Sequence, residues 1–459
     1  MSALQHIEFR TPLPVSAAEA FAWHERPGAL ERLTPPWETV QVVQRANSLQ
    51  PGERATVRVR IGPVSVNWIA EHRRYVPGVE FQDVQIGGPF AAFEHTHRME
   101  GNDTHNCTLV DAIDYRLPGG LLGRLLADGP IRAKLSRMFR YRHAVTAADL
   151  ALAAVHRGES PMKVLITGAT GLVGKSLIPL LTTSGHETYR LVRSEPSEPN
   201  DIPWNPDQSE IHAAQLEGLD AVVHLAGENI AGARWSTAVK QRLRDSRIKS
   251  TTLLCETLAG LADKPKTLIC ASAIGYYGDR GADELTESSP AGDGFLPNLC
   301  RDWEAACEPA RQAGIRVVNL RIGVVLTPQG GALSKMLLPF QLGGGGVMGS
   351  GEQYWSWIAI DDLVGAIHHC LLRDDLVGPV NATAPESATN REFTKTLGAV
   401  LHRLTILPMP AFAARLALGE MADALLLAST RVVPRRLTET GYDFRCPTLE
   451  SALKHVLGR

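Results

Sequence analysis

Residues 163–174 read KVLITGATGLVG, an apolar strand followed by a glycine-rich turn, and a helix is predicted directly afterward at 175–183. Gly168 permits the tight bend, Gly171 lets the backbone approach a pyrophosphate, and Gly174 lets the helix pack closely on the strand. The helix N-terminus presents free N–H groups and the positive end of the helix dipole. This order of elements predicts a dinucleotide-binding loop made of Gly168, Ala169, Thr170, Gly171, Leu172, Val173 and Gly174. A glycine-rich turn without a ligand is the alternative.

From Met162 onward, apolar strands alternate with helical stretches. The predicted strands are KVLIT (163–167), TYRLV (188–192), AVVHLA (221–226), TLICAS (267–272) and RVVNLRIG (316–323). A helical stretch follows each of them, which is the βαβ pattern of a parallel sheet with helices on both faces. The sequence therefore predicts an α/β Rossmann domain, a doubly wound parallel sheet, over residues 162–459.

The first part of the chain has a different pattern. Residues 157–161 (RGESP) are small, polar or helix-breaking, so they mark a boundary and predict a separate domain at 1–157. Alternating polar and apolar residues in this domain predict strands at 56–61, 65–70, 80–84, 93–99 and 107–115. Apolar residues at helical spacing then predict one long helix at 131–155. An antiparallel meander followed by a long helix is an α+β arrangement.

The bulk composition limits the classes of partner. The net charge is −2 and no basic run occurs, so neither nucleic acid nor a membrane surface is indicated as a partner. No apolar run is long enough to span a bilayer. The seven cysteines are scattered without a C-x-x-C pair, and His368 and His369 have no carboxylate or cysteine at ligand spacing. We therefore expect a cytoplasmic protein with reduced thiols, a small-molecule substrate and no metal site.

The end of the second strand bears on the choice of cofactor. Enzymes that use NAD place an acidic residue there for the ribose hydroxyls, whereas an arginine accommodates the 2′-phosphate of NADP. The sequence reads LVRS (191–194), without Asp or Glu, and Arg193 stands at the strand end. This favours NADP(H), with Arg193 contacting the 2′-phosphate. An ordinary surface arginine is the alternative, and Arg190 is expected to line the sheet.

Further segments resemble the extended short-chain dehydrogenase/reductase superfamily, and more narrowly an epimerase family with a C-terminal extension, here about 405–459. The matching segments are VVHLAGENI (222–230), KQRLRDSRI (240–248), SAIGYYG (272–278), LRIGVVL (320–326), SWIAIDDLV (356–364), NATAPESATNREF (381–393) and VVPRRLTETGYDF (432–444). The resemblance implies that Leu225, Ala226 and Gly227 line the ribose and nicotinamide side, with Glu228 beside them. It also implies that Arg321 lies near the cofactor.

The N-terminal region resembles the START-like, polyketide-cyclase superfamily. The segments HERPGALERLTPPW (24–37) and GPFAAFEHTHRME (88–100) carry the resemblance. It implies a helix-grip fold, in which a curved sheet wraps a long helix around an apolar cavity that binds a ligand. The aromatic residues that would line this cavity, or else form an ordinary core, are Trp23, Trp37, Trp68, Phe81, Phe90 and Phe93.

The catalytic pattern of short-chain dehydrogenases is incomplete here. These enzymes use a Tyr-x-x-x-Lys pair, in which the lysine lowers the pKa of the phenol. Counted from Glu304, the two positions fall near Leu296 and Cys300, and the superfamily serine falls at Ala273. Ser272 and Tyr277 are therefore the candidate catalytic residues. Packing at the strand end is the alternative for Tyr276 and Tyr277.

Three further polar or glycine-rich segments bear on the site. Lys240, Arg244 and Arg247 form either a helix face beside the cofactor cleft or a solvated basic face. The glycine-rich residues 343–351 predict a flexible loop on the substrate side. Asp361 and Asp362 are expected to cap the helix that follows them.

Two functional hypotheses follow from these features. The first is an NADP(H)-dependent oxidoreductase or epimerase that acts on a small or sugar-like substrate, with an N-terminal domain that holds an apolar ligand. The second is a dinucleotide-binding sensor without catalysis. The missing Tyr-Lys pair favours the second hypothesis, and the phosphate loop is common to both.

Overall fold

The computed structural model describes residues 4–459. The chain forms two compact units, the first mainly from residues up to Glu159 and the second mainly from residues starting at Ser160. Each unit has its own hydrophobic core. The core residues of the first lie between Ile7 and Leu150, and those of the second between Val164 and Leu457.

The N-terminal unit is a seven-stranded antiparallel sheet with the order β1-β7-β6-β5-β4-β3-β2. Its strands are β1 (Gln5–Leu13), β2 (Val40–Gln44), β3 (Arg54–Ile61), β4 (Val64–Val76), β5 (Glu80–Gly87), β6 (Ala92–Gly101) and β7 (Cys107–Arg116). The predicted strands are confirmed, whereas the sequence analysis missed β1 and β2. The helices are α1 (Ala17–Glu25), α2 (Ala29–Arg32) and α3 (Gly120–Val155).

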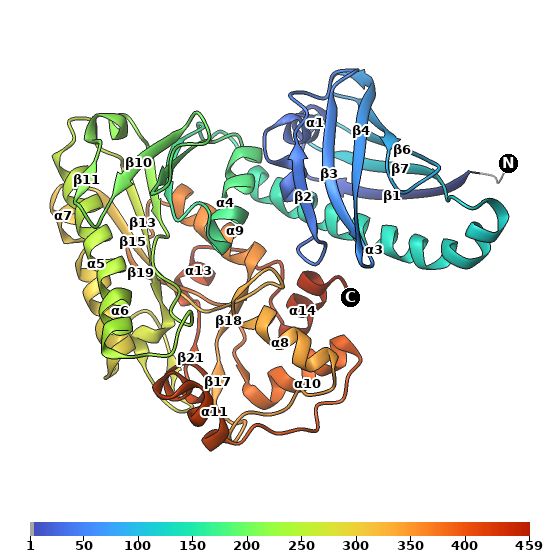
Figure 1. Ribbon diagram of the computed structural model, residues 1–459. Coiled ribbons are helices and arrows are strands. Elements are labelled where there is room, and N and C mark those ends of the chain that lie inside the picture. The colour runs from blue at the N-terminus through green and yellow to red at the C-terminus, as the bar shows by residue number, and fades with distance from the viewer. Residues whose placement is uncertain (1–3) are drawn as a thin grey trace. The chain divides into compact units, whose positions relative to one another are not determined.

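Helix α3 lies along one face of this sheet (Figure 1). It begins at Gly120, well before the predicted start at Ile131, and it continues through Pro130. The ring of Phe139 stacks on Phe9 of β1 with 5.4 Å between centroids, which fixes the helix on the sheet. A sheet that packs around one long helix is the helix-grip fold expected from the resemblance.

The C-terminal unit has an eight-stranded sheet with the order β11-β10-β9-β8-β12-β13-β15-β19, parallel except for β11. The strands are β8 (Lys163–Thr167), β9 (Glu187–Val192), β10 (Asp201–Asn205), β11 (Glu210–Ile211), β12 (Ala221–His224), β13 (Thr267–Ala273), β15 (Arg316–Ile322) and β19 (Gly378–Ala382). The strand order reverses between β8 and β12, which is where ligands bind in open α/β sheets. This confirms the predicted Rossmann fold.

Helices cover both faces of this sheet. One core includes residues of α4 and α9, and the other includes residues of α5, α6 and α7. The helices of the unit are α4 (Leu172–Thr183), α5 (Thr237–Gly260), α6 (Phe295–Ala305), α7 (Glu308–Gln312), α8 (Gly331–Gln341), α9 (Ile360–Leu372), α10 (Asn390–Leu401), α11 (Ala411–Leu418), α12 (Glu420–Ala422), α13 (Arg435–Glu439) and α14 (Leu449–Leu457). Single helical turns are η1 (Ala213–Leu216), η2 (Ile274–Tyr277) and η3 (Asp423–Leu427). Short strands are β14 (Glu284–Leu285), β16 (Val324–Leu326), β17 (Tyr354–Trp355), β18 (Trp357–Ala359), β20 (Ala388–Thr389) and β21 (Arg431–Val432).

One local prediction is wrong. Asp361 and Asp362 lie inside the first turn of α9 and make no cap, because Ala359 is the N-cap and provides no side-chain hydrogen bond. The glycine-rich segment 343–351 is a loop, as predicted, and its flexibility stays a prediction. Gly345 and Gly346 are buried, and a Cβ on Gly346 would lie 1.6 Å from the carbonyl oxygen of Leu407. These glycines permit a close approach of two chain segments.

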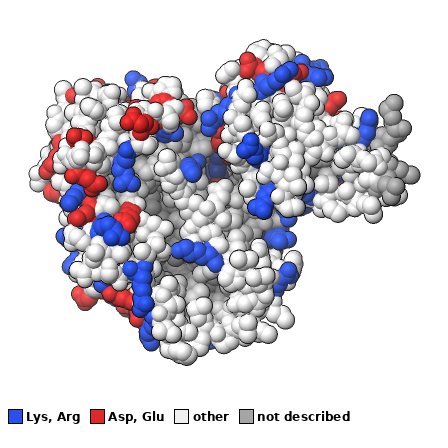
Figure 2. All heavy atoms as spheres, in the orientation of Figure 1, with Lys and Arg blue, Asp and Glu red and all other residues white. Residues whose placement is uncertain are grey.

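All seven cysteines are buried and unpaired, as predicted. Among the described residues, no helix is long and apolar enough to cross a membrane. On the face drawn in Figure 2, basic and acidic side chains are interspersed over a surface that is mostly neither.

Candidate functional site

The glycine-rich loop after β8 has the geometry that the sequence predicted. Gly168 has a φ of +67°, and a Cβ there would lie 2.9 Å from the carbonyl carbon and oxygen of Leu225. A Cβ on Gly174 would lie 2.4 Å from the carbonyl oxygen of Gly168, and one on Gly171 would lie 3.1 Å from the same atom. The loop therefore keeps its shape only with glycine at 168 and 174, whereas a Cβ on Gly171 requires a shift of a few tenths of an ångström. Helix α4 begins at Leu172 rather than Lys175, so its first turn belongs to the loop.

A set of hydrogen bonds joins the loop to the end of β12. The Thr167 hydroxyl accepts hydrogen bonds from the backbone N–H groups of Leu225 (3.0 Å) and Ala226 (3.1 Å), and it lies 2.7 Å from Nδ1 of His224. The other ring nitrogen of His224 lies 2.9 Å from the hydroxyl of Thr251. Burial lowers the pKa of His224 to about 4. A neutral imidazole with its proton on Nε2 satisfies both contacts.

Residues 225–228 follow β12 at the carboxyl edge of the sheet, beside the phosphate loop. Leu225 and Ala226 are half-buried, whereas Gly227 and Glu228 are exposed. Arg247 of α5 donates a hydrogen bond to the backbone carbonyl of Glu228 (2.9 Å). The structure therefore brings residues 225–228 next to the loop, and their contact with a cofactor stays a prediction.

The basic residues of α5 are engaged by the protein. Lys240 pairs with Glu420, and Arg244 pairs with Asp302. The guanidinium of Arg247 lies 5.0 Å from the ring centroid of Trp303. Lys240 and Arg244 thus form ion pairs at the surface, and a role of this helix face beside a cofactor stays a prediction.

The two arginines of β9 and its end are placed differently. Arg190 makes a two-pronged ion pair with Asp201 of β10 at 2.5 and 2.7 Å, and this hydrogen bonding lowers the pKa of Asp201 to about 2. Arg193 is exposed and has no ion-pair partner among the described residues. It lines a pocket of about 170 Å³ together with Ser194, Glu195 and Trp204. The charge of Arg193 is therefore available to a ligand, whereas that of Arg190 is engaged by Asp201.

Three polar residues stand side by side across the carboxyl ends of neighbouring strands. Ser272 of β13 is paired in register with Arg321 of β15, and Arg321 is paired with Asn381 of β19. All three are buried. We refer to Ser272, Arg321 and Asn381 as the strand-end row.

Glu304 of α6 connects two members of the strand-end row. Its carboxylate accepts two hydrogen bonds from Arg321, both 2.9 Å long, and one from the Ser272 hydroxyl at 2.7 Å. The guanidinium of Arg321 also lies 3.5 Å from the ring centroid of Tyr276. Arg321 is 3% exposed and forms an ion pair with Glu304. Its position near a cofactor stays a prediction.

Tyr277 belongs to the same hydrogen-bond network. Its hydroxyl donates to Asn381 (2.7 Å) and accepts from Arg321 (2.9 Å). Its side chain is completely buried, and this burial raises its pKa to about 12 although Arg321 opposes the shift. A phenol in this environment keeps its proton at neutral pH. Its role as a catalytic residue stays a prediction.

The helix that carries the Tyr-x-x-x-Lys pair in short-chain dehydrogenases corresponds to α6. Its residues Leu296 and Cys300 lie beside η2, because a Cβ on Gly275 would lie 3.4 Å from Leu296 and 3.9 Å from the sulfur of Cys300. Burial raises the pKa of Cys300 to about 12. The positions counted in the sequence are thus at the site, without the residues that perform the proton transfer.

Comparison with known proteins identifies the C-terminal unit. Residues 164–382 match the NAD dependent epimerase/dehydratase family. An epimerase family protein from Mycobacterium bovis is 44% identical over 298 residues, which is 64% of this chain and 98% of that protein. The chain belongs to the epimerase family. The human epimerase family protein SDR39U1 is 40% identical over 301 residues, which is 64% of this chain and 100% of that protein.

Solved structures extend the comparison of this epimerase-family protein to both units. The crystal structure of the nucleoside-diphosphate sugar epimerase from Corynebacterium glutamicum covers 98% of this chain and 90% of its own, with 33% identity and a TM-score of 0.81. The human SDR39U1 structure with NADPH covers 64% of this chain and 99% of its own, with 39% identity and a TM-score of 0.60. Residues 13–138 match the polyketide cyclase/dehydrase and lipid transport family, and residues 409–456 match a domain of unknown function.

The sequence analysis missed several polar residues of the epimerase-family protein. Glu304 and Asn381 were not predicted as site residues, because only strand register and helix packing bring them to Arg321. Glu287 was also missed, and one of its oxygens accepts hydrogen bonds from the backbone N–H groups of Asn381 (3.1 Å) and Arg436 (3.2 Å). A charged residue one position before the end of an apolar strand, as Arg321 is in β15, is a signal that could have prompted a search for a buried counter-charge.

Proposed function

We propose that the C-terminal unit binds NADP(H) and acts as an oxidoreductase or epimerase on a small or sugar-like substrate. The observation that carries the proposal is the loop after β8, in which Gly168 and Gly174 leave no room for a Cβ and Gly171 leaves little. A glycine-rich turn that leads directly into a helix N-terminus is suited to a pyrophosphate. The human relative was solved with NADPH, which supports the same cofactor here.

Different residues around the loop are assigned to different parts of the cofactor. We propose that residues 168–174 hold the pyrophosphate, that Arg193 contacts the 2′-phosphate, and that Leu225, Ala226, Gly227 and Glu228 line the ribose and nicotinamide side. Arg193 supports the choice of NADP(H) because its charge is not engaged by another described residue. When bound, a nicotinamide supplies or accepts a hydride.

The chain itself supplies the hydrogen bonds for the reacting oxygen. We propose that Ser272 orients a substrate oxygen and that Tyr277 is the proton-bearing group, with Arg321 and Glu304 as positioning residues. Tyr277 has a raised pKa, whereas a lysine neighbour would lower it. Its hydroxyl donates to Asn381, so this hydrogen bond must break before the proton reaches a substrate oxygen, which favours slow turnover.

A sensor without catalysis is the second candidate. It is favoured by Leu296 and Cys300, which occupy the tyrosine and lysine positions on α6, and by the protein partners that already engage Tyr277. In either case the N-terminal unit is proposed to hold an apolar ligand, in agreement with its match to a family of lipid transport and cyclase proteins.

The experiment that tests the proposal compares two glycine variants. In Gly174→Ala the new Cβ would lie 2.4 Å from the Gly168 carbonyl oxygen and 2.7 Å from the Ala169 Cα, so the loop must shift and NADPH binding should be lost. Gly260→Ala is the control, since its Cβ would meet nothing within 4 Å. Binding is measured by titration calorimetry. Equal affinity of both variants would contradict the assigned site.

Turnover distinguishes the enzyme from the sensor. The small molecules that co-purify with the full chain are identified by mass spectrometry, and carbonyl compounds of the same class are offered with NADPH. Oxidation of NADPH by the wild type and its loss in Tyr277→Phe, with NADPH binding retained, supports the enzyme. Unchanged turnover in the variant excludes Tyr277 as the proton donor.

A further inference from the structure

The N-terminal unit contains a cluster of histidines and aspartates on one face of its sheet. His95 and His97 of β6 are two residues apart, so their side chains point to the same side. In the strand register Asp83 of β5 is opposite His95, and Asp111 of β7 is opposite His97. Both imidazoles and the Asp111 carboxylate are buried, between 3% and 7% exposed. The sheet thus brings four ionisable side chains together on one face.

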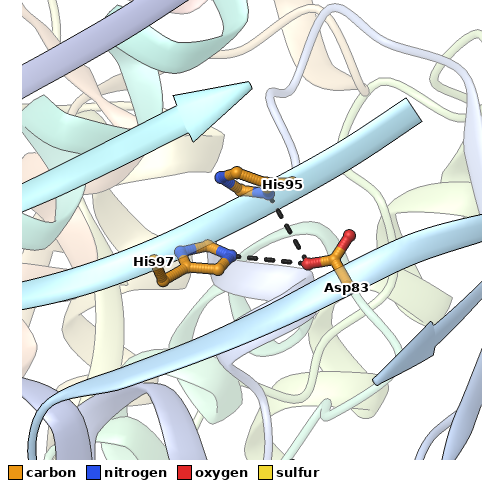
Figure 3. A group of neighbouring side chains, drawn as sticks. All are labelled: Asp83, His95 and His97. Carbon is orange, nitrogen blue, oxygen red and sulfur yellow. Dashed lines mark ion pairs between the residues drawn. The ribbon is translucent and has the colours of Figure 1, made fainter. Parts of the chain in front are cut away.

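The distances in this cluster fit a bound metal ion better than hydrogen bonds. Oδ1 of Asp83 lies 3.6 Å from Nδ1 of His95 and 3.6 Å from Nε2 of His97 (Figure 3). The three donor atoms all lie within 4.8 Å of one another. A hydrogen bond at 3.6 Å is too long to count. Ligand atoms at 2.0–2.2 Å from a tetrahedral zinc ion are about 3.3–3.6 Å apart, which matches the two distances from Asp83.

Asp111 approaches the opposite nitrogens of both rings. Its Oδ1 lies 3.4 Å from Nε2 of His95 and 2.8 Å from Nδ1 of His97. Its Oδ2 accepts a hydrogen bond from Nε2 of His143 (3.1 Å). The other ring nitrogen of His143, Nδ1, lies 2.8 Å from the hydroxyl of Thr11. A carboxylate on the far nitrogen of each ligating histidine is the usual outer shell of a metal site. Asp111 therefore orients the remaining nitrogens toward Asp83.

The two imidazoles each have one nitrogen toward Asp111 and one toward Asp83. Nε2 of His95 and Nδ1 of His97 lie 3.4 and 2.8 Å from Oδ1 of Asp111, and none of these three buried atoms makes a well-aligned hydrogen bond in the described part of the chain. Nδ1 of His95 and Nε2 of His97 face Asp83, and these are the nitrogens offered to a metal ion. Aromatic rings close the surroundings, since Phe81 stacks on His97 at 4.1 Å and Phe139 meets His95 edge-on at 4.8 Å. Aromatic rings therefore flank both imidazoles, whereas the side chain of Asp83 is 19% exposed.

We propose that Asp83, His95 and His97 bind a divalent transition metal ion, with zinc as the first candidate, and that Asp111 positions both imidazoles. Two histidines and one carboxylate form a donor set that zinc and iron(II) accept, and three protein ligands leave a coordination position open. An oxygen donor of a ligand held inside the helix-grip unit would occupy that position. The sequence analysis predicted no metal site, because these residues form no local motif.

Metal binding is tested on the full chain without a histidine tag, after treatment with a chelator. Calorimetric titration with Zn²⁺ should show one ion per chain and a raised melting temperature. His95→Ala and Asp83→Asn should lose this binding, whereas Asp111→Asn should weaken it by about 10- to 100-fold. His6→Ala is the control, because His6 lies in the same unit with a side chain that is 55% exposed. It should bind like the wild type.

Substitution with Co²⁺ keeps the proposal testable if a variant fails to fold. The wild type should then show the intense visible absorption of a tetrahedral Co²⁺ ion with nitrogen and oxygen ligands. The alternative to a bound metal ion is a proton on the imidazole of His97. Although burial opposes the protonation of His97, Asp111 and Asp83 raise its pKa to about 9. Absence of Zn²⁺ binding by the wild type, binding unchanged in His95→Ala, or a purely octahedral Co²⁺ spectrum would overturn the proposal.

Discussion

Arg193 offers a test of cofactor choice at a single side chain. Arg193 is exposed at the end of β9, whereas Arg190, three residues earlier in the chain, forms an ion pair with Asp201. A hydrogen bond to a charged group contributes about 1.5–3 kcal/mol, so Arg193→Ala should weaken NADPH binding by about 10- to 100-fold. NADH lacks the 2′-phosphate, and its affinity should stay nearly unchanged. Titration calorimetry with both nucleotides measures the ratio.

Arg190→Ala is the matched control for this prediction. It removes a charge of the same sign from the same strand, and it breaks the ion pair with Asp201 without touching the pocket residues next to Arg193. The ratio of NADPH to NADH affinity should therefore stay as in the wild type. A ratio that falls equally in both variants would show that the 2′-phosphate is not bound through Arg193.

His224 makes stability depend on pH. Its folded-state pKa is about 4 because of burial, below the ordinary value of 6.5, so the unfolded chain binds the proton more readily. Stability is therefore full above pH 6.5 and falls as the pH is lowered toward 4. The loss is roughly 3 kcal/mol between pH 7 and pH 4. Urea unfolding of His224→Gln should show a weaker pH dependence in this window.

The exposed residue His212 provides the control for the pH measurement. Its side chain lies on the surface of the same unit, so His212→Gln should keep the wild-type pH dependence. The contribution of other buried histidines is common to all three proteins and drops out of the comparison. If His224→Gln and the wild type lost stability in parallel, His224 would not be the group that titrates.

At the scale of elements, predictions succeeded where a pattern is local. The strand, loop and first helix around Gly168 were predicted because three glycines report on backbone geometry within a few residues. The strands β10 and β19 were missed, since Pro203 and Pro379 interrupt them and proline indicates a break rather than a strand. Helix α3 was cut short at Pro130 for the same reason. Tertiary packing keeps these elements in place despite their low propensity.

The first turn of α9 connects the sheet to the C-terminal extension. Asp362 accepts hydrogen bonds from the backbone N–H groups of Arg445 (2.8 Å) and Cys446 (3.0 Å), one on each oxygen. Asp362→Asn replaces one acceptor by a donor that faces an N–H group, which should cost about 1–3 kcal/mol. Faster hydrogen exchange in residues 442–457 measures the loosened segment.

Asp374→Asn is the control for α9, because the Asp374 side chain is completely exposed just after the helix. Its unfolding free energy should change by less than about 0.5 kcal/mol. Equal exchange in the two variants would show that Asp362 does not hold the extension. The sequence analysis placed this aspartate correctly at the helix start and assigned it the wrong partner, because a cap and a long-range acceptor look alike in sequence.

At the scale of the whole molecule, sites differ in how far apart their residues lie in sequence. The glycine-rich loop is contiguous, so its geometry was predictable. The strand-end row joins Ser272, Arg321 and Asn381 only through sheet register, and the Asp83–His95–His97 cluster depends on an antiparallel register in the other unit. No local pattern encodes such a register before the pairing of strands is known. Ser272 and Arg321 could therefore be named from the sequence, whereas their link to Glu304 and Asn381 and the histidine cluster could not.

The separate cores of the two units lead to a prediction about the isolated C-terminal part. The core residues of one unit are confined to the first 150 residues, and those of the other begin at Val164. The relative from Mycobacterium bovis matches 98% of its length with only 64% of this chain, so a protein of that extent exists by itself. Residues 160–459 alone should therefore fold cooperatively in a single transition. Their affinity for NADPH should equal that of the full chain, since every proposed cofactor contact lies within them. Calorimetry of both proteins gives the comparison, and a fragment that folds but binds NADPH much more weakly would show that the first 159 residues contribute to the cofactor site.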